Sequence, residues 1–488
     1  MKVKQQTVCQ TCRNRKLGCD GRKPVCGQCT HKNLQCHWDL AGHTFISQND
    51  RTFTHQDPGG SKNSTEPRDI LYITPQSHTD IYPQQNTPYS TATQTPSFET
   101  TCNQVESIFK AFVPQEERSS IYQVHPTPQI CGAWIGVLPK LLQGPDSRDK
   151  KVLSLAIETL FAGITKKPCE QTIQTYAAAI DAVHMIENSE PLNPLLAAAI
   201  ICLTLAELML PDSRSGFAMH VNGIARLFQA NEPSRFTSGV LQGLFDGYRP
   251  LFMLQALQSR KETFIAMDEW IRIPFMNREV SSMQSLISEA SSLPSILQQT
   301  DQILASDKPS LNEVLEPCKK YIELLSKIQT WENSLQSDLR NIQSLPQPNP
   351  TEVHPSLRIE FPNITLANVY TQLWSYRIIC TLELMDLVSR FPEMDLPLYL
   401  PGCSLSVRDV GELTENHAVK ICCGIEYLVR DDMGLYGPAS TLLPLQMAYR
   451  VFGMDRLRNA TYITFIEGVV RHLVEKGLQC APYLVYGK

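Results

Sequence analysis

The chain has 488 residues, of which 42% are hydrophobic and 19% are charged, and its formal net charge is −5. A chain of this length can hold two or three domains, and its apolar content is sufficient for a large core in one of them. The longest apolar run spans residues 195–206. Because a membrane helix needs roughly 20 apolar residues, we expect a buried core helix there and no membrane protein.

The formal charges are distributed unevenly along the chain. Residues 1–40 contain eight Lys and Arg residues against two Asp residues, a net charge of +6, whereas the remaining residues carry a net charge of −11. A polyanionic partner should therefore bind the N-terminal segment. Residues 1–6 lack the apolar core of a secretory signal, so we expect an intracellular protein with reduced thiols.

Six of the 16 cysteines lie between residues 9 and 36, where the spacing C-x2-C-x6-C occurs twice. A Cys-x2-Cys turn can bring two thiolates to one tetrahedral zinc ion. Two such ions need eight ligand positions, so two of the six cysteines must bridge both ions if no outside ligand takes part. The symmetric choice is the first cysteine of each half. The sequence therefore predicts a two-zinc cluster, with Cys9 and Cys26 as the bridges, held by Cys9, Cys12, Cys19, Cys26, Cys29 and Cys36.

Two other interpretations of this segment are a disulfide framework in a secreted module and a zinc knuckle or ribbon that binds one ion. Neither explains six cysteines in a duplicated order. With six sulfurs completing both zinc sites, we expect His31 and His37 to be surface histidines and not ligands.

The segment resembles the fungal binuclear zinc cluster transcription regulators, in which two zinc ions share six cysteines. The resemblance rests on the cysteine spacing, on the basic run RNRK at 13–16 and on the inter-half loop CDGRKPVC at 19–26, in which Pro24 matches the proline that turns the chain. It implies a nuclear regulator of genes transcribed by RNA polymerase II that reads CGG-like, GC-rich triplets. A pathway-specific regulator of a biosynthetic gene cluster is a finer expectation, with the transcription machinery or co-regulators as further partners.

The run after Cys12 contains good helix formers, so we expect a short helix that projects basic side chains into the major groove. By resemblance, Lys16 matches the family's base-contacting lysine and Arg15 matches the cation before it. Gly18 stands where the family tends to have a basic residue. The predicted DNA contacts are Arg13, Arg15, Lys16, Arg22 and Lys23.

Residues 41–104 are rich in Ser, Thr, Gln, Asn and Pro and show no helical or alternating apolar period. We expect a disordered linker here, because such a segment has too little apolar area to offset the entropy of ordering. No heptad run follows the cysteines, so the coiled-coil dimerisation of many family members is not expected. A homodimer through the helical domain remains open.

Residues 105–488 show helical apolar stripes and little strand-like alternation. Clear stripes begin at Leu324 and at Tyr462. We therefore expect an all-α regulatory domain, with room for two lobes, that resembles the helical domain downstream of the cluster in the same regulators. Helix breakers are expected at 211–213, 233–234 and 437–438. A Ser- and Gln-rich stretch at 281–300 and a proline-rich loop at 346–362 should interrupt the helices.

Some residues of the helical region have more than one interpretation. His220, Gly223 and Leu227 share one helix face, and we expect a core histidine beside a close helix contact at the glycine. Cys422 and Cys423 should be buried, with redox sensing as the alternative. Acidic pairs at 116–117 and 431–432 should be solvated surface. A group of Met and aromatic residues near the C-terminal end should belong to the core, although they could instead line an effector pocket. They are Met433, Tyr436, Met447, Tyr449 and Phe452.

The chain contains no Gly-rich phosphate loop, nucleophile elbow, His-Glu-x2-His pair or dinucleotide fingerprint. We therefore predict that the protein is not an enzyme. Two alternatives to a DNA-binding regulator remain: a zinc-containing interaction scaffold or co-regulator without its own sequence-specific reading, and an enzyme that carries an accessory DNA module.

Overall fold

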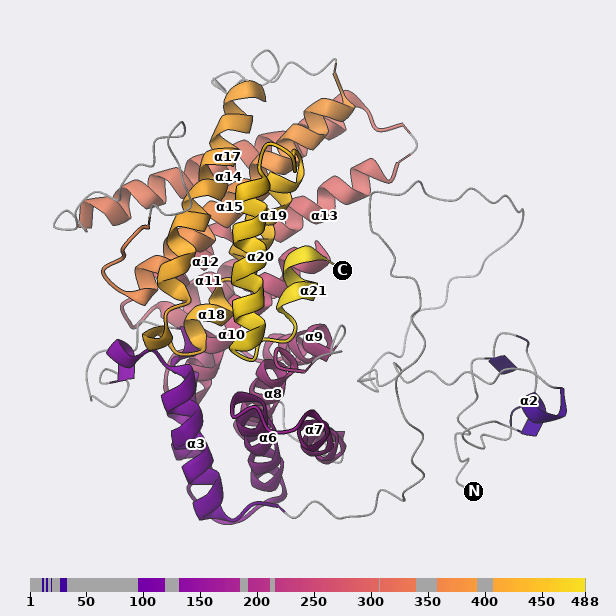
Figure 1. The fold of residues 1–488 in the computed structure, drawn as a ribbon, viewed down its shortest axis with the longest axis vertical. Helices are drawn as coiled ribbons and strands as arrows, with labels where there is room; N and C mark the ends of the chain where they lie inside the picture. The colour runs from indigo at the N-terminus through magenta and orange to yellow at the C-terminus, as the bar shows by residue number, and fades with distance from the viewer. Residues whose placement is uncertain are drawn as a thin grey trace. The chain divides into compact units, whose positions relative to one another are not determined.

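The computed structural model describes residues 11–12, 15, 19, 27–32, 95–118, 131–184, 192–210, 216–306, 308–338, 358–392 and 407–487. The chain divides into two units, residues 1–68 and residues 69–488. All regular elements in these ranges are helices (Figure 1), which confirms the predicted fold class. No helix among them is both long and apolar enough to cross a lipid bilayer.

The first helix of the larger unit, α3 (Phe98–Phe112), begins inside the segment that we assigned to the linker. Its N-cap residue Ser97 accepts a hydrogen bond from the backbone N–H of Thr100 at 3.2 Å, which satisfies one of the free donors of the first turn. Val105, Ile108 and Phe109 form its buried face, and α3 packs on α6. The helical body therefore starts before residue 105, and residues 41–94 lie outside the described ranges.

A group of helices and one short 3-10 turn form one end of the body, at the bottom of Figure 1. They are α3, η2 (Cys131–Val137), α5 (Leu138–Leu142), α6 (Arg148–Ile164), α7 (Cys169–His184), α8 (Pro194–Glu207) and α9 (Gly216–Gln229). The predicted core helix is α8, and it is buried on all sides from Leu196 to Glu207. Asn193 caps it by accepting from the N–H of Leu195 at 2.9 Å. It packs between α6 and α9, as its uniformly apolar sequence requires.

A cluster of aromatic rings joins this end to the middle of the body. The rings come from α9, η3 (Pro233–Phe236), α10 (Gly239–Ser259), η4 (Phe264–Ala266), α11 (Asp268–Arg272) and η5 (Ile273–Phe275). Phe236 and Trp270 lie 5.2 Å apart between ring centroids, and Phe264 meets Trp270 edge to face at 4.8 Å. The predicted breaker at 233–234 is therefore a 3-10 turn that inserts Phe236 into this cluster.

Residues 281–300 are mostly helical, with a short turn at 291–292, which corrects the predicted interruption. They form α12 (Ser282–Ala290) and most of α13 (Leu293–Leu304). Leu286, Ile287 and Leu293 are almost fully buried, so a sparse apolar stripe is sufficient to hold these Ser- and Gln-rich helices in the core. The side chain of Gln284 donates to the carbonyl oxygen of Asp246 at 2.9 Å. Pro250, four residues later in α10, has no N–H for this carbonyl.

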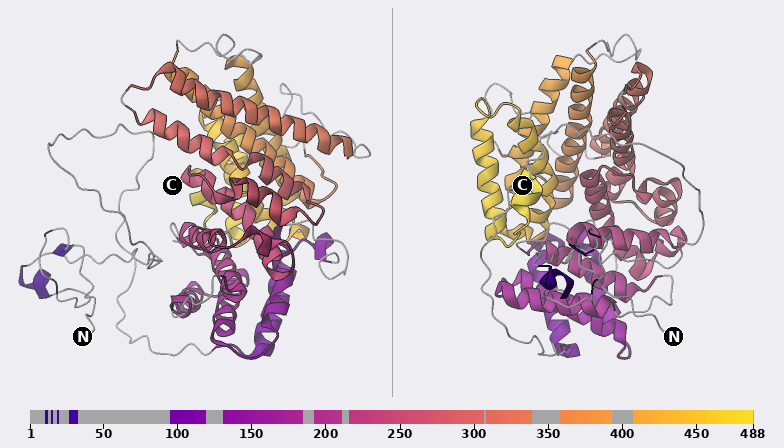
Figure 2. Two further views of the ribbon diagram at one scale, coloured as in Figure 1. Left: turned by 180° about the vertical axis from the view of Figure 1, so that it is seen from behind. Right: turned by 90° about the vertical axis from the view of Figure 1, so that its right-hand side faces the viewer.

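The other end of the body is built around α15 (Ile364–Arg390), which is buried along almost its whole length. It contacts α12, α14 (Leu311–Asp338), α17 (Val407–Leu428) and α19 (Leu442–Gly453), as Figures 1 and 2 show. The remaining elements are η1 (Gln115–Glu117), η6 (Asp431–Met433), α18 (Tyr436–Ser440), α20 (Ala460–Glu475) and α21 (Ala481–Tyr486). One continuous core of buried side chains extends from Val105 to Val485.

The two predicted apolar stripes form buried helix faces. In α14, Leu324 and Ile328 are buried and Trp331 packs against the core, while Leu339 lies outside the described residues. In α20, Ile466, Val470 and Leu473 are buried. The expected breaker at 437–438 lies within the short helix α18. Residues 211–213 and most of the proline-rich segment lie outside the described ranges.

An ion-pair network ties α10 to α13 and α15. Arg260, the C-cap residue of α10 at φ 50°, donates to both carboxylate oxygens of Glu383 at 2.8 Å and to Asp301 at 2.8 Å. The Glu383 side chain is only 6% exposed. A second pair, Arg377 with Glu332 at 2.7 Å, joins α15 to α14. The bidentate pairing of Arg260 with Glu383 fixes the orientation of the two side chains as well as pairing their charges.

Candidate metal centre and nucleic-acid interface

The two halves of the cysteine motif contain matching helical turns. The N–H of Arg15 donates to the carbonyl oxygen of Thr11 at 3.3 Å, and the N–H of Lys32 donates to that of Gln28 at 3.2 Å. Thr11 and Gln28 each precede the second cysteine of their half, and the second turn belongs to α2 (Gly27–His31). The duplication seen in the spacing is therefore also a duplication of local backbone structure.

The three described cysteines of the motif are buried. Cys12 and Cys29 are each 1% exposed and Cys19 is 9% exposed, although this unit offers few apolar residues to cover them. The Sγ atoms of Cys12 and Cys29 are 3.8 Å apart. Two thiolates bound to one tetrahedral zinc at about 2.3 Å would be separated by about 3.8 Å, so this distance is that of two ligands on one ion.

Cys9, Cys26 and Cys36 lie outside the described residues, so the bridging roles of Cys9 and Cys26 stay a prediction. In that arrangement Cys12 and Cys29 are terminal ligands of different ions. Terminal sulfurs on neighbouring ions are further apart than two sulfurs on one ion, so the bridged cluster requires a longer separation than the 3.8 Å between these two atoms.

Several described polar residues of this segment are exposed. Arg15 and Lys32 are exposed, and so is His31, in agreement with a surface histidine. The other predicted DNA contacts (Arg13, Lys16, Arg22 and Lys23) and His37 lie outside the described residues. Lys32 was not predicted as a contact, yet it occupies in the second half the position that Arg15 occupies in the first. The two halves of the motif have the same spacing, so each residue of the first half has a counterpart in the second. This repeat is the sequence signal that identifies Lys32 as the counterpart of Arg15.

In the helical body, His220 is buried as predicted, but its partners were not predicted. Nε2 of His220 lies 2.8 Å from the hydroxyl oxygen of Tyr176 and 3.6 Å from Oε1 of Glu207. The Tyr176 hydroxyl also donates to the Glu207 carboxylate. Burial, together with the negative charge of Glu207, raises the pKa of Tyr176 well above its usual range, so this phenol stays a proton donor.

The close glycine contact of this region lies at Gly216, four residues before His220. A Cβ atom at Gly216 would collide with the carboxylate of Glu207. The close approach between α9 and α8 therefore favours glycine at the first residue of α9. Gly216 lies two turns before Gly223, where the tight helix contact stays a prediction.

Cys422 and Cys423 are buried, with exposed fractions of 0% and 1%. Burial raises the pKa of Cys423 to about 11 and that of Cys422 well above its usual value. A redox sensor needs an accessible thiol with a lowered pKa, so these two thiols belong to the core. In the acidic pairs, Asp431, Asp432 and Glu116 are exposed, as expected for surface residues.

The Met and aromatic residues of 433–452 separate into two groups. Met433, Met447 and Phe452 are buried core residues, and Phe452 stacks on Tyr462 at 4.4 Å. Tyr436 instead lines a cavity of the body. The core interpretation therefore holds for most of the set, and the cavity has residues from many other helices.

The chain matches known proteins over its N-terminal segment. Residues 7–41 match the family model of the fungal Zn(2)-Cys(6) binuclear cluster domain. Over 34 residues the chain is 56% identical to the "Peroxisome proliferation transcriptional regulator" of Saccharomyces cerevisiae, which covers 7% of this chain and 3% of that protein. Over 36 residues it is 46% identical to "Transcription factor lfc1" of Flammulina velutipes, which covers 7% of this chain and 13% of that protein.

The matched segment is thus a small part of each of these curated relatives. No solved structure matches the chain.

Proposed function

Because residues 7–41 form a fungal Zn(2)-Cys(6) binuclear cluster domain, a domain that binds two structural zinc ions, we propose that this protein is a sequence-specific DNA-binding regulator of transcription and not an enzyme. The observation that carries the proposal is the pair of matching turns in which Cys12 and Cys29 are buried while Arg15 and Lys32 are exposed. A metal-fixed frame with cations on its outside is suited to a polyanion.

The six cysteines of the motif would hold the two zinc ions, with Cys9 and Cys26 as bridges. The ions supply cross-links that a segment with so few apolar residues cannot obtain from packing. Residues 1–40 carry a net charge of +6. Six thiolates and two zinc ions change this to about +4. The folded cluster thus stays positive in a chain that is acidic elsewhere, which favours DNA contact through this end.

The basic side chains divide by the part of the DNA that they can reach. Arg15 and Lys16 would meet guanine O6 and N7 atoms in the major groove, which suits a CGG-like triplet. Arg13, Arg22, Lys23 and, from its matching position, Lys32 would contact phosphates and set the register. The finer proposal, from the resemblance, is a nuclear regulator of RNA polymerase II genes that serves one biosynthetic gene cluster, with a homodimer through the helical body.

Selection of bound oligonucleotides from a random pool by the full-length protein tests the proposal directly. We expect enrichment of a CGG-like triplet, with spacing between two triplets if the protein is a dimer. Titration of an enriched duplex should show affinity that falls steeply with salt. No enrichment together with flat salt dependence would overturn the proposal and favour a zinc-containing interaction scaffold. Genomic fragments recovered in the same way identify the regulated genes.

A further inference from the structure

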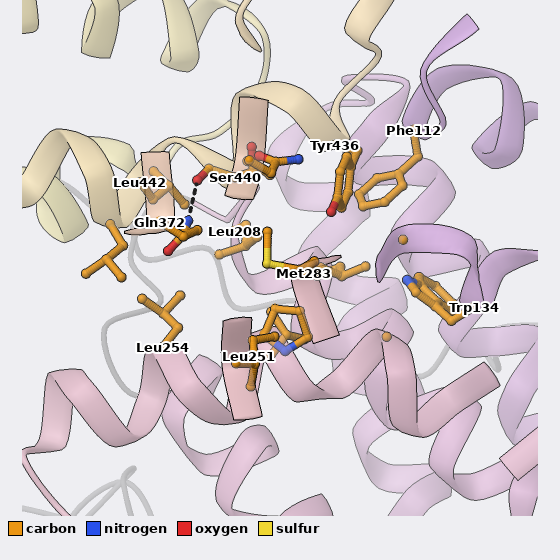
Figure 3. Close-up of a pocket in the computed structure, with 18 of the residues that line it drawn as sticks. Phe112, Trp134, Leu208, Leu251, Leu254, Met283, Gln372, Tyr436, Ser440 and Leu442 are labelled. Carbon is orange, nitrogen blue, oxygen red and sulfur yellow. Dashed lines mark hydrogen bonds between the residues drawn. The ribbon is translucent and has the colours of Figure 1, made fainter. Parts of the chain in front are cut away.

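A cavity of about 120 Å³, partly open to solvent, lies among the helices of the body. Its walls come from α8, α10, α12, α15, α18 and α19, with η2 and the end of α3 at one side. Figure 3 shows the side chains of Trp134, Leu251, Leu254, Met283, Tyr436 and Leu442 around it. None of the described residues that line this cavity is charged.

Two close contacts shape the aromatic side of the cavity. A Cβ atom at Gly247 of α10 would collide with the Trp134 side chain, and one at Gly132 would collide with Phe112 and Tyr436. Phe112 and Tyr436 meet edge to face, with ring centroids 5.9 Å apart. These glycines therefore let the rings pack closely against the backbone, and the cavity remains where the helices themselves do not meet.

Asn368 of α15 lines this cavity and is only 1% exposed. Neither its side-chain nitrogen nor its side-chain oxygen has a hydrogen-bond partner among the described residues. One turn further along α15, the amide nitrogen of Gln372 donates to the carbonyl oxygen of Ser440 at 3.1 Å, as Figure 3 shows. The cavity thus holds one amide that is fixed by the protein and one amide whose donor and acceptor are both free.

A buried amide without partners costs free energy, and an apolar residue at this position of a fully buried helix would avoid that cost. A water molecule could bond to such a group, but an apolar cavity offers it few further partners. Both atoms are closed to a molecule the size of water in this structure, so a ligand with an adjacent donor and acceptor could pair with both once the Asn368 side chain turns toward the cavity. We propose that this cavity is a binding site for a compact, neutral, largely apolar molecule that carries a carboxamide or an undissociated carboxyl group.

The size and polarity of the cavity limit the ligand further. A hole of roughly 150 Å³ in a protein core accepts benzene, so a cavity of about 120 Å³ limits the buried part of the ligand to a single ring or a short branched chain. The absence of a charged side chain among the described lining residues disfavours carboxylates and phosphates, which would lose their hydration without gaining a counter-ion. The proposal concerns binding to the helical body and stands independently of DNA reading.

The test is a titration of the full-length protein by calorimetry and by ligand-observed NMR, with benzamide as the probe and with benzene and benzoate as controls. We expect benzamide to bind at least about tenfold more tightly than either control. Asn368→Leu should reduce benzamide affinity by about tenfold and leave benzene affinity unchanged, because it removes the paired amide and keeps the apolar walls.

Two further measurements keep the result interpretable. Circular dichroism and the melting temperature report whether Asn368→Leu folds, and without ligand it should be at least as stable as the original protein. Leu254→Phe narrows the cavity from another helix and should weaken all binding. Equal benzamide binding by the original protein and Asn368→Leu, or no benzamide binding at millimolar concentration, would overturn the proposal.

Discussion

The hydroxyl group of Tyr176 on α7 lies 2.8 Å from Nε2 of His220 on α9. The same hydroxyl donates to the carboxylate of Glu207, which stands at the end of α8 and is 3% exposed. The three helices are thus joined through one phenol. The second carboxylate oxygen of Glu207 has no hydrogen-bond partner in the described ranges, so among them the hydroxyl of Tyr176 is the hydrogen-bond donor to this carboxylate.

Replacement of Tyr176 by Phe should lower the free energy of unfolding by about 1 to 3 kcal/mol, because it leaves a buried carboxylate without its donor. Urea unfolding of the full-length protein, followed by circular dichroism, measures the loss. Tyr483→Phe is the matched control, since this ring is 37% exposed, and it should change the stability by less than about 0.5 kcal/mol. Equal effects of the two variants would show that the hydroxyl of Tyr176 contributes no more to stability than that of an exposed tyrosine.

The sequence was most informative where local spacing alone determines structure. The duplicated cysteine spacing predicted a duplicated turn, and the continuous apolar run at 195–206 predicted the buried helix α8. Both signals are local, because metal ligands and uniformly buried helices impose their pattern on neighbouring residues. The tie between Tyr176 and Glu207 was not predicted, since it joins different helices and nothing in either segment indicates the other.

Residues 281–300 show a different limit of sequence reasoning. Their Ser and Gln content suggested a break, but Met283, Leu286 and Ile287 are buried at helical spacing in α12, and Leu293 is buried at the start of α13. Polar residues such as Gln284 are accommodated because the rest of the fold supplies partners, including the backbone oxygen of Asp246. Asn368 gave no signal for the opposite reason, because its lack of a partner becomes visible only when the surrounding helices are placed.

Lys16→Ala and Lys32→Ala should weaken DNA binding in different ways. Lys16 is proposed to contact a base, so its loss should cost about 1 to 3 kcal/mol on a CGG-containing duplex and reduce discrimination at one position. Lys32 is proposed to contact phosphate, so its loss should be the same on every duplex and should lower the salt slope by about 1.

Fluorescence anisotropy on matched and scrambled duplexes at several salt concentrations separates these two patterns. Lys151→Ala, an exposed lysine on α6, is the control for charge alone and should leave affinity unchanged. An equal loss for Lys16→Ala on both duplexes would assign that side chain to the DNA backbone instead.

Removal of zinc should unfold the N-terminal cluster and leave the helical body folded. Binding of zinc contributes on the order of 10 kcal/mol per site in small zinc modules, whereas the body has a continuous core of its own. Treatment with a chelator should abolish DNA binding with little change in helical circular dichroism, and added zinc should restore binding. Native mass spectrometry should count two zinc ions per chain. One ion, or disulfides in place of metal, is incompatible with the proposed cluster.

Arg260→Met should destabilise the body by about 2 to 3 kcal/mol. The change leaves the 6% exposed carboxylate of Glu383 without the bidentate partner that holds it at 2.8 Å, and breaking a buried pair costs more than a surface pair contributes. Arg272→Met is the matched control, because its pair with Asp268 is largely exposed on both sides. Chemical denaturation of both variants measures the change in the free energy of unfolding. A loss for Arg260→Met no larger than that for Arg272→Met would show that the network does not contribute to stability.

Stability should fall as the pH rises above about 8.5, and Cys423 should account for part of the fall. Burial, assisted by the charge of Glu426, raises the pKa of this thiol to about 11, whereas an unfolded cysteine ionises near about 8.5. Between these values the folded state keeps the proton that the unfolded state has lost. The stabilising contribution is therefore complete below about pH 8.5 and decreases by up to about 1.4 kcal/mol per pH unit through this window.

Urea unfolding of the reduced protein at pH 8 and at pH 10.5 measures this slope. Cys423→Ala should be less stable at both pH values because it leaves a cavity, but its stability should decrease less between them. Cys169→Ala changes an exposed thiol and should keep the full slope. Other buried thiols, such as Cys422, also have a raised pKa, so part of the slope must remain in Cys423→Ala. A slope that is identical in all three proteins would mean that Cys423 ionises in the folded state as readily as in the unfolded chain.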